Sequence, residues 1–343
     1  MKNPSRKGRK TRVLRTGISS LFISGLVYFL IAGLLMVTGK PDQPGQEKIG
    51  PAFDELNFDY AGLPRPKSFQ ARDGTQLRYR HYASDSDKAL ILLHGSGYHN
   101  RYLLPLAGFI SRENLAHVYT PDLRGHGRSP VRRGDIDYIG QLEDDLVDFL
   151  KLIRGKHPDA QLILGGHSSG GGLAIRFAGN PHGRQVDGYF LLSPFLKYNA
   201  PTMRPDSGGW AQPYTSRIIG LEMLNNAGIR YFNHLRIIRF NMPEEMRDGT
   251  ETLSYSYRLN SSFSPRNYKK DLAAISEPLL LAAGTADKAF KAQQFEPTIS
   301  QYTDVQVELL NGVTHMGVVV GEEIRPVIKK WLESFSLKGQ VKP

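Results

Sequence analysis

The stretch Gly165-Gly166-His167-Ser168-Ser169-Gly170-Gly171-Gly172 decides how this chain folds. It follows a short apolar run at residues 161–164 and precedes a segment typical of a helix at 173–178. A strand, a tight turn with serine between glycines and then a helix form the setting of the G-x-S-x-G nucleophile elbow. Small residues at Gly166 and Gly170 let strand and helix approach closely, so the Ser168 hydroxyl would project into solvent. The ordinary alternative is a glycine-rich turn with an incidental serine.

Apolar runs that alternate with helical patterns surround this turn and predict a parallel, doubly wound α/β sheet. Strands are expected at 89–93, 116–120, 161–164, 188–192, 278–282 and 305–309, after a hairpin at 69–82 that turns at Asp73-Gly74. Helices are expected at 101–113, 139–154, 271–275 and 321–336. In such sheets the ligand site lies beyond the carboxyl ends of the strands. Residues 94–97, residues 122–129 and Ser168 all follow strands, so we expect them to meet there.

Residues 197–265 break this alternation, and we interpret them as a helical cap inserted into a core formed by 66–196 and 266–343. The segment 218–240 has the pattern of an amphipathic helix. The aromatic residues of the region are Trp210, Tyr214, Tyr231, Phe232, Phe240, Tyr255, Tyr257 and Phe263. They either line a substrate pocket or pack the cap on itself, and the two interpretations are compatible.

The amino terminus has the composition of a membrane anchor. Residues 1–17 contain seven Lys and Arg and no acid, and the twenty residues 18–37 carry no charge. A helix of that length crosses the hydrocarbon core of a bilayer. The positive-inside rule then predicts a single-pass signal anchor at 18–38, a cytoplasmic tail at 1–17 and a folded domain on the periplasmic or extracellular side. The alternative is a signal peptide whose cleavage yields a secreted protein, but Val37-Thr38-Gly39-Lys40 is a poor cleavage site.

Composition excludes several classes of site and partner. The 343 residues are 40% hydrophobic and include no Cys, which excludes disulfides, thiolate metal sites and a cysteine nucleophile. The formal charge is +11, and without the seven basic residues of the tail it would be +4. The basic excess therefore favours a membrane flank over nucleic acid. Residues 39–65, rich in Pro and Gly, are expected to be a linker.

Two later residues complete a possible catalytic set with Ser168. A serine hydroxyl is a weak nucleophile and needs a base to take its proton and a carboxylate to orient that base. Asp287 follows a predicted strand in a glycine-containing turn, and His315 is the only histidine after it. The chain order Ser, Asp, His is one of the known solutions. Other candidates do not follow strands, namely His182, His234 and Asp304.

Five segments together resemble the α/β-hydrolase fold and, more narrowly, its monoacylglycerol lipase, lysophospholipase and serine aminopeptidase S33 branch. They are residues 94–97 (His-Gly-Ser-Gly), 122–129 (Asp-Leu-Arg-Gly-His-Gly-Arg-Ser), 166–170, 284–287 and 314–315. The resemblance runs from about residue 67 to 337 and does not include the cap. It implies Ser168 as nucleophile, Asp287 as acid and His315 as base, with an oxyanion hole formed by the backbone N–H groups of Ser96 and Ser169. It also implies that residues 122–129 form a structural loop beneath the site and that His94 and His167 occupy positions that are seldom catalytic.

The same resemblance implies hydrolysis of carboxylic esters through an acyl-serine intermediate, without a cofactor or a metal. A membrane-bound protein with an aromatic cap suggests monoacyl lipids, such as monoacylglycerol or lysophospholipid, as substrates. A peptidase of the aminopeptidase type is the second hypothesis, and it would need an acidic cluster for which Glu244 and Glu245 are the only paired acids in the cap. A binding protein that keeps the fold without catalysis is the third.

Overall fold

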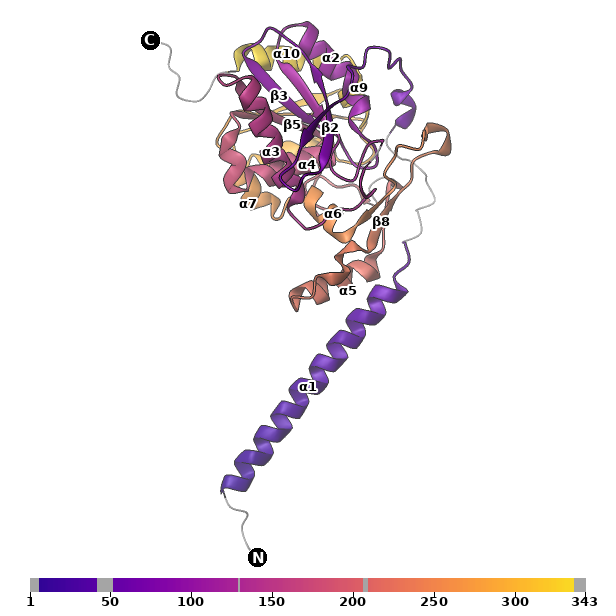
Figure 1. Cartoon of the computed structure of the whole chain (residues 1–343), viewed down its shortest axis with the longest axis vertical. Helices are drawn as coiled ribbons and strands as arrows, with labels where there is room; N and C mark the ends of the chain where they lie inside the picture. The colour runs from indigo at the N-terminus through magenta and orange to yellow at the C-terminus, as the bar shows by residue number, and fades with distance from the viewer. Residues whose placement is uncertain (1–5, 42–51, 129, 206–208, 336–343) are drawn as a thin grey trace, which may run out of the picture.

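A large mixed sheet with helices on both faces forms the centre of the protein (Figure 1). The computed structural model describes residues 6–41, 52–128, 130–205 and 209–335, with side chains from residue 19 onward. Ser129, the linker residues 42–51, the tail residues 1–5 and the chain end at 336–343 lie outside the described residues.

The sheet has eight strands in the order β1-β2-β4-β3-β5-β6-β10-β11. Their bounds are β1 (Lys67–Gln70), β2 (Gln76–Tyr82), β3 (Lys88–Leu93), β4 (His117–Pro121), β5 (Gln161–His167), β6 (Gly188–Leu192), β10 (Leu279–Gly284) and β11 (Gln306–Leu310). The pairs β1–β2 and β2–β4 are antiparallel, and the other pairs are parallel. The predicted hairpin at Asp73-Gly74 and the six predicted strands are all confirmed. The strand at 188–192 has the predicted bounds, and the ends of the others differ by at most three residues.

Helices cover the two faces of the sheet. They are α2 (Leu104–Arg112), α3 (Gln141–Lys156), α4 (Ser169–Ala178), α7 (Tyr268–Ala273), α8 (Phe295–Ile299), α9 (Gly317–Val320) and α10 (Ile324–Ser334), with the short 3₁₀ helices η1 (Phe53–Leu56), η2 (Asn100–Leu103), η3 (Pro181–Gln185) and η7 (Ala292–Gln294). The helices predicted at 101–113, 139–154, 271–275 and 321–336 correspond to η2 with α2, α3, α7 and α10. The last predicted helix is shorter than expected at both ends.

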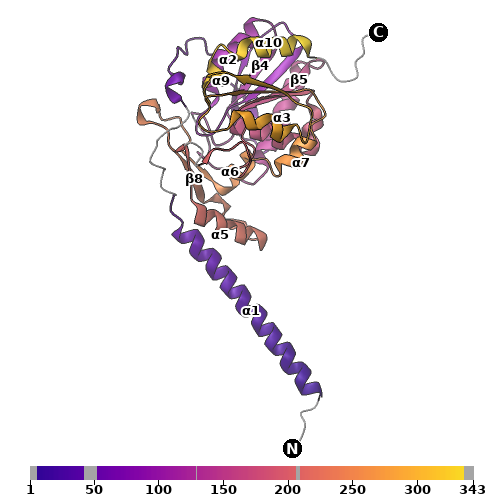
Figure 2. The same ribbon diagram turned by 180° about the vertical axis from the view of Figure 1, so that it is seen from behind.

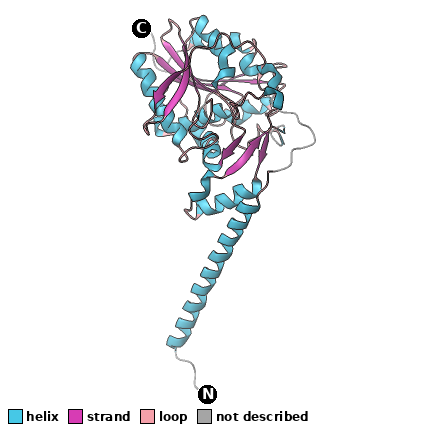
Figure 3. Ribbon diagram, turned by 45° about the vertical axis from the view of Figure 1, so that its right-hand side comes forward, coloured by secondary structure: helices cyan, strands magenta, loops and turns pink. Residues whose placement is uncertain are grey.

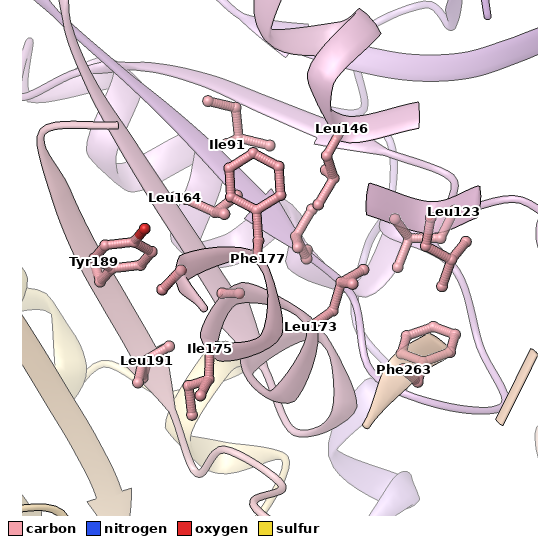
Figure 4. Packing of buried hydrophobic residues seen from close by; sticks show 14 of the residues in the cluster. Ile91, Leu123, Leu146, Leu164, Leu173, Ile175, Phe177, Tyr189, Leu191 and Phe263 are labelled. Atoms are coloured by element: carbon pink, nitrogen blue, oxygen red, sulfur yellow. The ribbon is translucent and has the colours of Figure 1, made fainter. Parts of the chain in front are cut away.

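Alternation along the buried strands divides the core into two layers. In β3, Ile91 packs with the layer under α3 and α4, whereas Leu90 and Leu92 pack with the layer under α2 and α10. Figure 4 shows the first layer, where Phe177 of α4 lies among side chains from the sheet and from α3. Successive side chains of a strand point to opposite faces, so a strand buried on both faces is apolar throughout.

A second, three-stranded antiparallel sheet lies outside the main one (Figure 3). It belongs to a segment composed of β7 (Ala211–Pro213), α5 (Thr215–Asn226), η5 (Tyr231–His234), β8 (Arg236–Phe240), η6 (Glu244–Met246), β9 (Ser254–Ser256) and α6 (Tyr257–Phe263). The prediction of one helix over 218–240 is therefore wrong beyond Asn226. Gly228 has a positive φ of 82°, which ends the helical path, and β8 pairs with β7 and β9. The expected helical cap is thus a mixed α and β segment.

The expected linker is partly wrong as well. Within residues 52–63, Phe53 and Leu56 are buried in the layer under α2 and α10. The Thr314 hydroxyl also donates a hydrogen bond of 2.8 Å to the Glu55 carboxylate. The apolar residues of this segment follow no helical or strand periodicity. They are nevertheless buried, because the segment packs on a core that other elements form.

The first helix, α1 (Arg6–Thr38), projects away from the folded domain (Figures 1 and 2). Its part from Ser19 to Thr38 has a mean hydropathy of 2.3 and is 6% buried, so it is long and apolar enough to cross a membrane. Its carboxyl end contacts α5. Arg217 donates hydrogen bonds of 3.1 Å to the carbonyls of Met36 and Gly39, and the Tyr28 hydroxyl donates one of 2.8 Å to the Met223 carbonyl.

Candidate active site

The turn between β5 and α4 holds Ser168 in a strained conformation, with φ of 54° and ψ of −120°. A Cβ atom on Gly166 would lie 2.3 Å from the carbonyl carbon of Gly170, and one on Gly170 would lie 2.5 Å from the His94 carbonyl oxygen. Only glycine fits at either position. The Ser168 main chain is also fixed on both sides, because its N–H donates to Leu192 O at 2.9 Å and its carbonyl accepts from Gly172 N at 3.1 Å. The tight turn expected from the sequence is present.

Asp287 and His315 form a buried pair. Asp287 follows β10 and is 1% exposed, His315 follows β11 and is 4% exposed, and Asp287 Oδ2 lies 2.8 Å from His315 Nδ1. The other carboxylate oxygen accepts N–H bonds from Ala289 at 2.7 Å and Phe290 at 3.0 Å. Burial acts to raise the pKa of Asp287, but His315 and these two N–H groups outweigh it and lower that pKa. An ionised carboxylate held in this way keeps the proton on His315 Nδ1 and leaves Nε2 as the acceptor.

His167 connects this pair to the turn at Ser168. Its Nε2 donates a hydrogen bond of 3.0 Å to the His315 carbonyl oxygen, and the two rings lie 4.5 Å apart. Among the described residues, no hydrogen bond joins the Ser168 hydroxyl to His315. Catalytic hydrogen bonds are often long before substrate binds, so this does not remove either residue from the candidate set.

Tyr102 supports the same corner, and sequence reasoning missed it. Its hydroxyl accepts the Gly95 N–H at 2.7 Å and donates to His167 Nδ1 at 2.8 Å. The Tyr102 ring comes from η2, which follows β3, and nothing in the sequence pattern distinguishes it from a core tyrosine. Burial lowers the pKa of His167 well below its usual value, so this histidine stays neutral and acts as a fixed hydrogen-bond link.

The two residues expected to form an oxyanion hole, Ser96 and Ser169, lie side by side. Their hydroxyl oxygens are 2.6 Å apart. The flanking amides are engaged, since Gly95 N–H donates to Tyr102 and Gly97 N–H donates to the Tyr255 hydroxyl at 2.8 Å. Within the described part of the chain, neither Ser96 N–H nor Ser169 N–H has a partner. Free N–H groups of two neighbouring residues, one of them at the start of a helix, can stabilise a developing negative charge.

Trp210 and Tyr255 bring the mixed segment into the site. A Cβ atom on Gly97 would lie 2.8 Å from the Trp210 ring, so the indole rests directly on the loop that carries Ser96. The Trp210 ring also stacks on Phe240 at 5.1 Å. Tyr255 in β9 receives the Gly97 N–H, and its hydroxyl lies 2.6 Å from His126 Nε2. The sequence predicted a cap with many aromatic residues, but it did not indicate that Trp210 and Tyr255 are the ones that contact the site.

The segment after β4 packs beneath these residues. His94 Nε2 accepts the Leu123 N–H at 3.1 Å, and burial lowers the pKa of His94 to about 4. Asp122 Oδ1 accepts the Asn100 N–H at 3.1 Å, and burial raises the pKa of Asp122 to about 6. Both groups are committed to holding loops together.

The fold and these contacts agree with a comparison across protein families, in which the model described as serine aminopeptidase, S33 matches residues 84–319. The chain belongs to this family. Among its relatives, the chain is similar to monoglyceride lipase from Rattus norvegicus, with 23% identity over 71% of the chain and 78% of that protein. It is similar to monoglyceride lipase from Homo sapiens, with 24% identity over 79% and 88%.

Solved structures also resemble this protein. A soluble variant of monoglyceride lipase from Saccharomyces cerevisiae, in complex with a substrate analog, has a TM-score of 0.62 at 19% identity and covers 81% of this chain and 97% of that one. A membrane phospholipase A described as a bacterial virulence factor has a TM-score of 0.54 at 18% identity, with 95% and 100% covered. These likenesses establish the α/β-hydrolase fold. With the family and the relatives, they make the protein a hydrolase of the lipase or esterase type.

Proposed function

We propose that the protein is a serine hydrolase that cleaves carboxylic esters through an acyl-serine intermediate. Ser168 is the nucleophile, His315 the general base and Asp287 the carboxylate that orients it. The observation that carries this proposal is the bond of 2.8 Å between Asp287 and His315, next to a serine in a strained strand-to-helix turn. No cofactor and no metal takes part in this reaction.

In the first half of the reaction, His315 Nε2 takes the proton of the Ser168 hydroxyl while Ser168 Oγ attacks the ester carbonyl carbon. The carbonyl oxygen becomes an oxyanion that accepts hydrogen bonds from the N–H groups of Ser96 and Ser169. Protonated His315 then gives its proton to the leaving alcohol. Asp287 stays ionised throughout, in line with its lowered pKa, and stabilises the imidazolium.

In the second half, His315 takes a proton from water, and the hydroxide attacks the acyl-serine carbonyl. The same two N–H groups hold the second oxyanion. When this intermediate collapses, the proton returns to Ser168 Oγ and the carboxylic acid leaves.

We propose monoacyl lipids as substrates. Two relatives are named monoglyceride lipases, and the aromatic pair of Trp210 and Phe240 lies beside the loop that carries Ser96. Apolar side chains of this kind line pockets for acyl chains. A peptidase reading has weaker support, because an acid that binds a substrate amine should face the site. Glu244 and Glu245 are instead exposed on η6.

We infer that α1 anchors the protein, with residues 1–17 in the cytoplasm and the hydrolase domain on the far side of the membrane. The basic tail before the apolar span supports this orientation. The bonds from Arg217 to the Met36 and Gly39 carbonyls support retention of the helix, since cleavage after α1 would remove one face of α5's packing.

Replacement of Ser168 tests the proposal. Ser168→Ala should lower kcat for monoacyl esters by about 10⁴-fold or more, because nucleophile and base act as a unit. The variant should also lose labelling by a fluorophosphonate and keep the unfolding transition of the wild type. Ser276→Ala, at an exposed serine, is the matched control and should change neither activity nor labelling. Near-normal turnover in Ser168→Ala would show that the elbow assignment is wrong.

A further inference from the structure

Three histidines meet at the end of the sheet opposite to Ser168. His81 lies in β2, His117 is the first residue of β4, and His157 directly follows α3. One ring nitrogen from each lies within 4.8 Å of the others. Since β3, β4 and β5 are parallel and Ser168 follows the carboxyl end of β5, the start of β4 lies at the other edge. The cluster is therefore separate from the candidate active site.

Strand register explains why two of these rings come together. His81 pairs with Tyr119 across the antiparallel β2–β4 ladder, and His117 precedes Tyr119 by two positions. Alternate residues of a strand share one face, so all three side chains lie on the same side of the sheet. The His81 ring stacks on the Tyr119 ring at 4.3 Å, and His81 Nε2 lies 3.4 Å from His117 Nδ1.

The third ring arrives from the end of a helix. His157 caps the carboxyl end of α3, and its ring lies 4.2 Å from that of His117. The carboxyl end of a helix carries partial negative charge, which favours a cation. His157 Nε2 lies 2.8 Å from the Tyr119 hydroxyl. If Nε2 donates to that oxygen, Nδ1 is free to bind a metal ion, with the hydroxyl as the outer partner that ligating histidines usually have.

The spacing suits a tetrahedral site. With Zn–N bonds of about 2.0–2.1 Å, two ligand nitrogens lie roughly 3.4 Å apart. His81 and His117 already have this separation. One ring nitrogen of His157 lies within 4.8 Å of the ligand nitrogens of His81 and His117, and rotation of these partly buried rings would shorten the remaining distances. The Ser84 N–H, which now donates to His117 Nδ1 at 3.1 Å, would pass to water.

The protonation state of the three histidines also fits a metal site. Burial lowers the pKa of all three histidines, that of His81 to about 4, and a neutral imidazole is the form that binds metal ions. Among the described residues, the charged side chains that act on the pKa values of these three histidines are Lys67, Lys156 and Asp85. The two ammonium groups oppose a cation, and the carboxylate favours one.

We propose that His81, His117 and His157 bind one divalent ion of borderline softness, Zn²⁺ or a close analogue such as Co²⁺. Three imidazoles suit Zn²⁺, Cu²⁺ and Ni²⁺, whereas Mg²⁺ and Ca²⁺ prefer oxygen ligands. Water fills the fourth position. The ion joins β2 and β4 to the end of α3, so its role is structural. It takes no part in ester cleavage.

Binding of Co²⁺ and Zn²⁺ to the full-length protein in detergent, without a histidine tag and after treatment with a chelator, tests this proposal. One equivalent of Co²⁺ should produce the visible absorption of a four-coordinate site, and Zn²⁺ should displace it. Zn²⁺ should also raise the melting temperature of the protein. Ester hydrolysis should be the same before and after chelation.

Variants identify the ligands. His157→Gln should weaken Co²⁺ binding at least about 100-fold, and Tyr119→Phe should weaken it by about tenfold through loss of the outer partner. His182→Gln, at an exposed histidine in η3, should bind like the wild type. Melting temperatures without metal verify that each variant is folded. Absence of saturable binding by the wild type, or equal binding by His157→Gln, would overturn the site. Loss of hydrolysis on chelation would overturn the structural role.

Discussion

Ser168 adopts backbone angles that few residues other than glycine tolerate, at a cost of about 1–3 kcal/mol. The surrounding main chain makes this conformation unavoidable, because Gly166 and Gly170 pack atom against atom and Leu192 and Gly172 bond to the Ser168 peptide groups. The residue before it, His167, is tied to His315. These contacts therefore hold the proposed nucleophile in a fixed position relative to the proposed base, in spite of the strain.

Asp122 gives a prediction on pH dependence at the residue scale. Burial raises its pKa to about 6 in the folded state, from 3.8. The stability that its protonated form provides is present below pH 4 and is lost as pH rises through about 6. Asp122→Asn mimics the protonated form. The free energy of unfolding of this variant, relative to the wild type, should rise by about 2 kcal/mol between pH 4 and pH 7.

Chemical denaturation of the detergent-solubilised proteins at several pH values measures this difference. Asp159→Asn, at an exposed position, serves as the control for loss of one charge. If the difference in free energy of unfolding between Asp122→Asn and the wild type stays constant from pH 4 to pH 7, the pKa of Asp122 is not raised by burial.

At the scale of elements, the mixed segment divides into two parts with different neighbours. Trp210, Phe240 and Tyr255 contact the loops of the active site. Phe232 packs instead with Leu221 and Ile237, in a small cluster that also takes in Met36 of α1. One part of the segment thus borders the site, whereas the other part joins the domain to α1.

This division predicts which aromatic sets chain-length preference. Each buried CH₂ contributes about 0.8 kcal/mol, so kcat/KM of the wild type for monoacyl esters should rise roughly fourfold per CH₂ until the pocket is full. Trp210→Ala should flatten that rise. Phe232→Ala should lower the melting temperature and leave the slope unchanged. Assays with acyl chains from acetyl to dodecanoyl decide the matter, and a flat dependence in the wild type would argue against a lipid substrate.

At the scale of the whole molecule, α1 extends away from a hydrolase domain that touches it through α5 (Figure 1). If α1 spans the membrane, the eight-stranded sheet and its helices lie on one side of it. The substrate would then reach the site from that side. The mixed segment would lie at the lipid surface, because α5 bonds to Tyr28, Met36 and Gly39 along the carboxyl-terminal part of α1 and the residues just after it.

Topology reporters test the orientation. A reporter that is active only in the exported compartment should work when it is fused after Pro343. The same reporter should be silent when it is fused after Arg15, ahead of the apolar span. Reporter activity in the reverse pattern would place the domain in the cytoplasm. Recovery of the domain as a soluble fragment that begins near Lys40 would indicate a cleaved signal peptide.

The sequence by itself determined the sheet, its hairpin and the fold class, because buried strands are recognised by uninterrupted apolar runs and the elbow by its glycines. It also named Ser168, Asp287 and His315 as candidates, since each follows a strand and such ends share one edge. These patterns lie within short segments, so they can be recognised in a single sequence.

Other features depended on contacts between distant segments. Only the tertiary structure turned the expected helix at 218–240 into a helix and a strand, because β8 exists through its pairing with β7 and β9. Only the tertiary structure gave Tyr102 its hydroxyl partners at Gly95 and His167. The three-histidine cluster likewise joins residues 36 and 40 positions apart along the chain. These contacts depend on residues that are far apart in the sequence, so the pattern within one segment does not predict them.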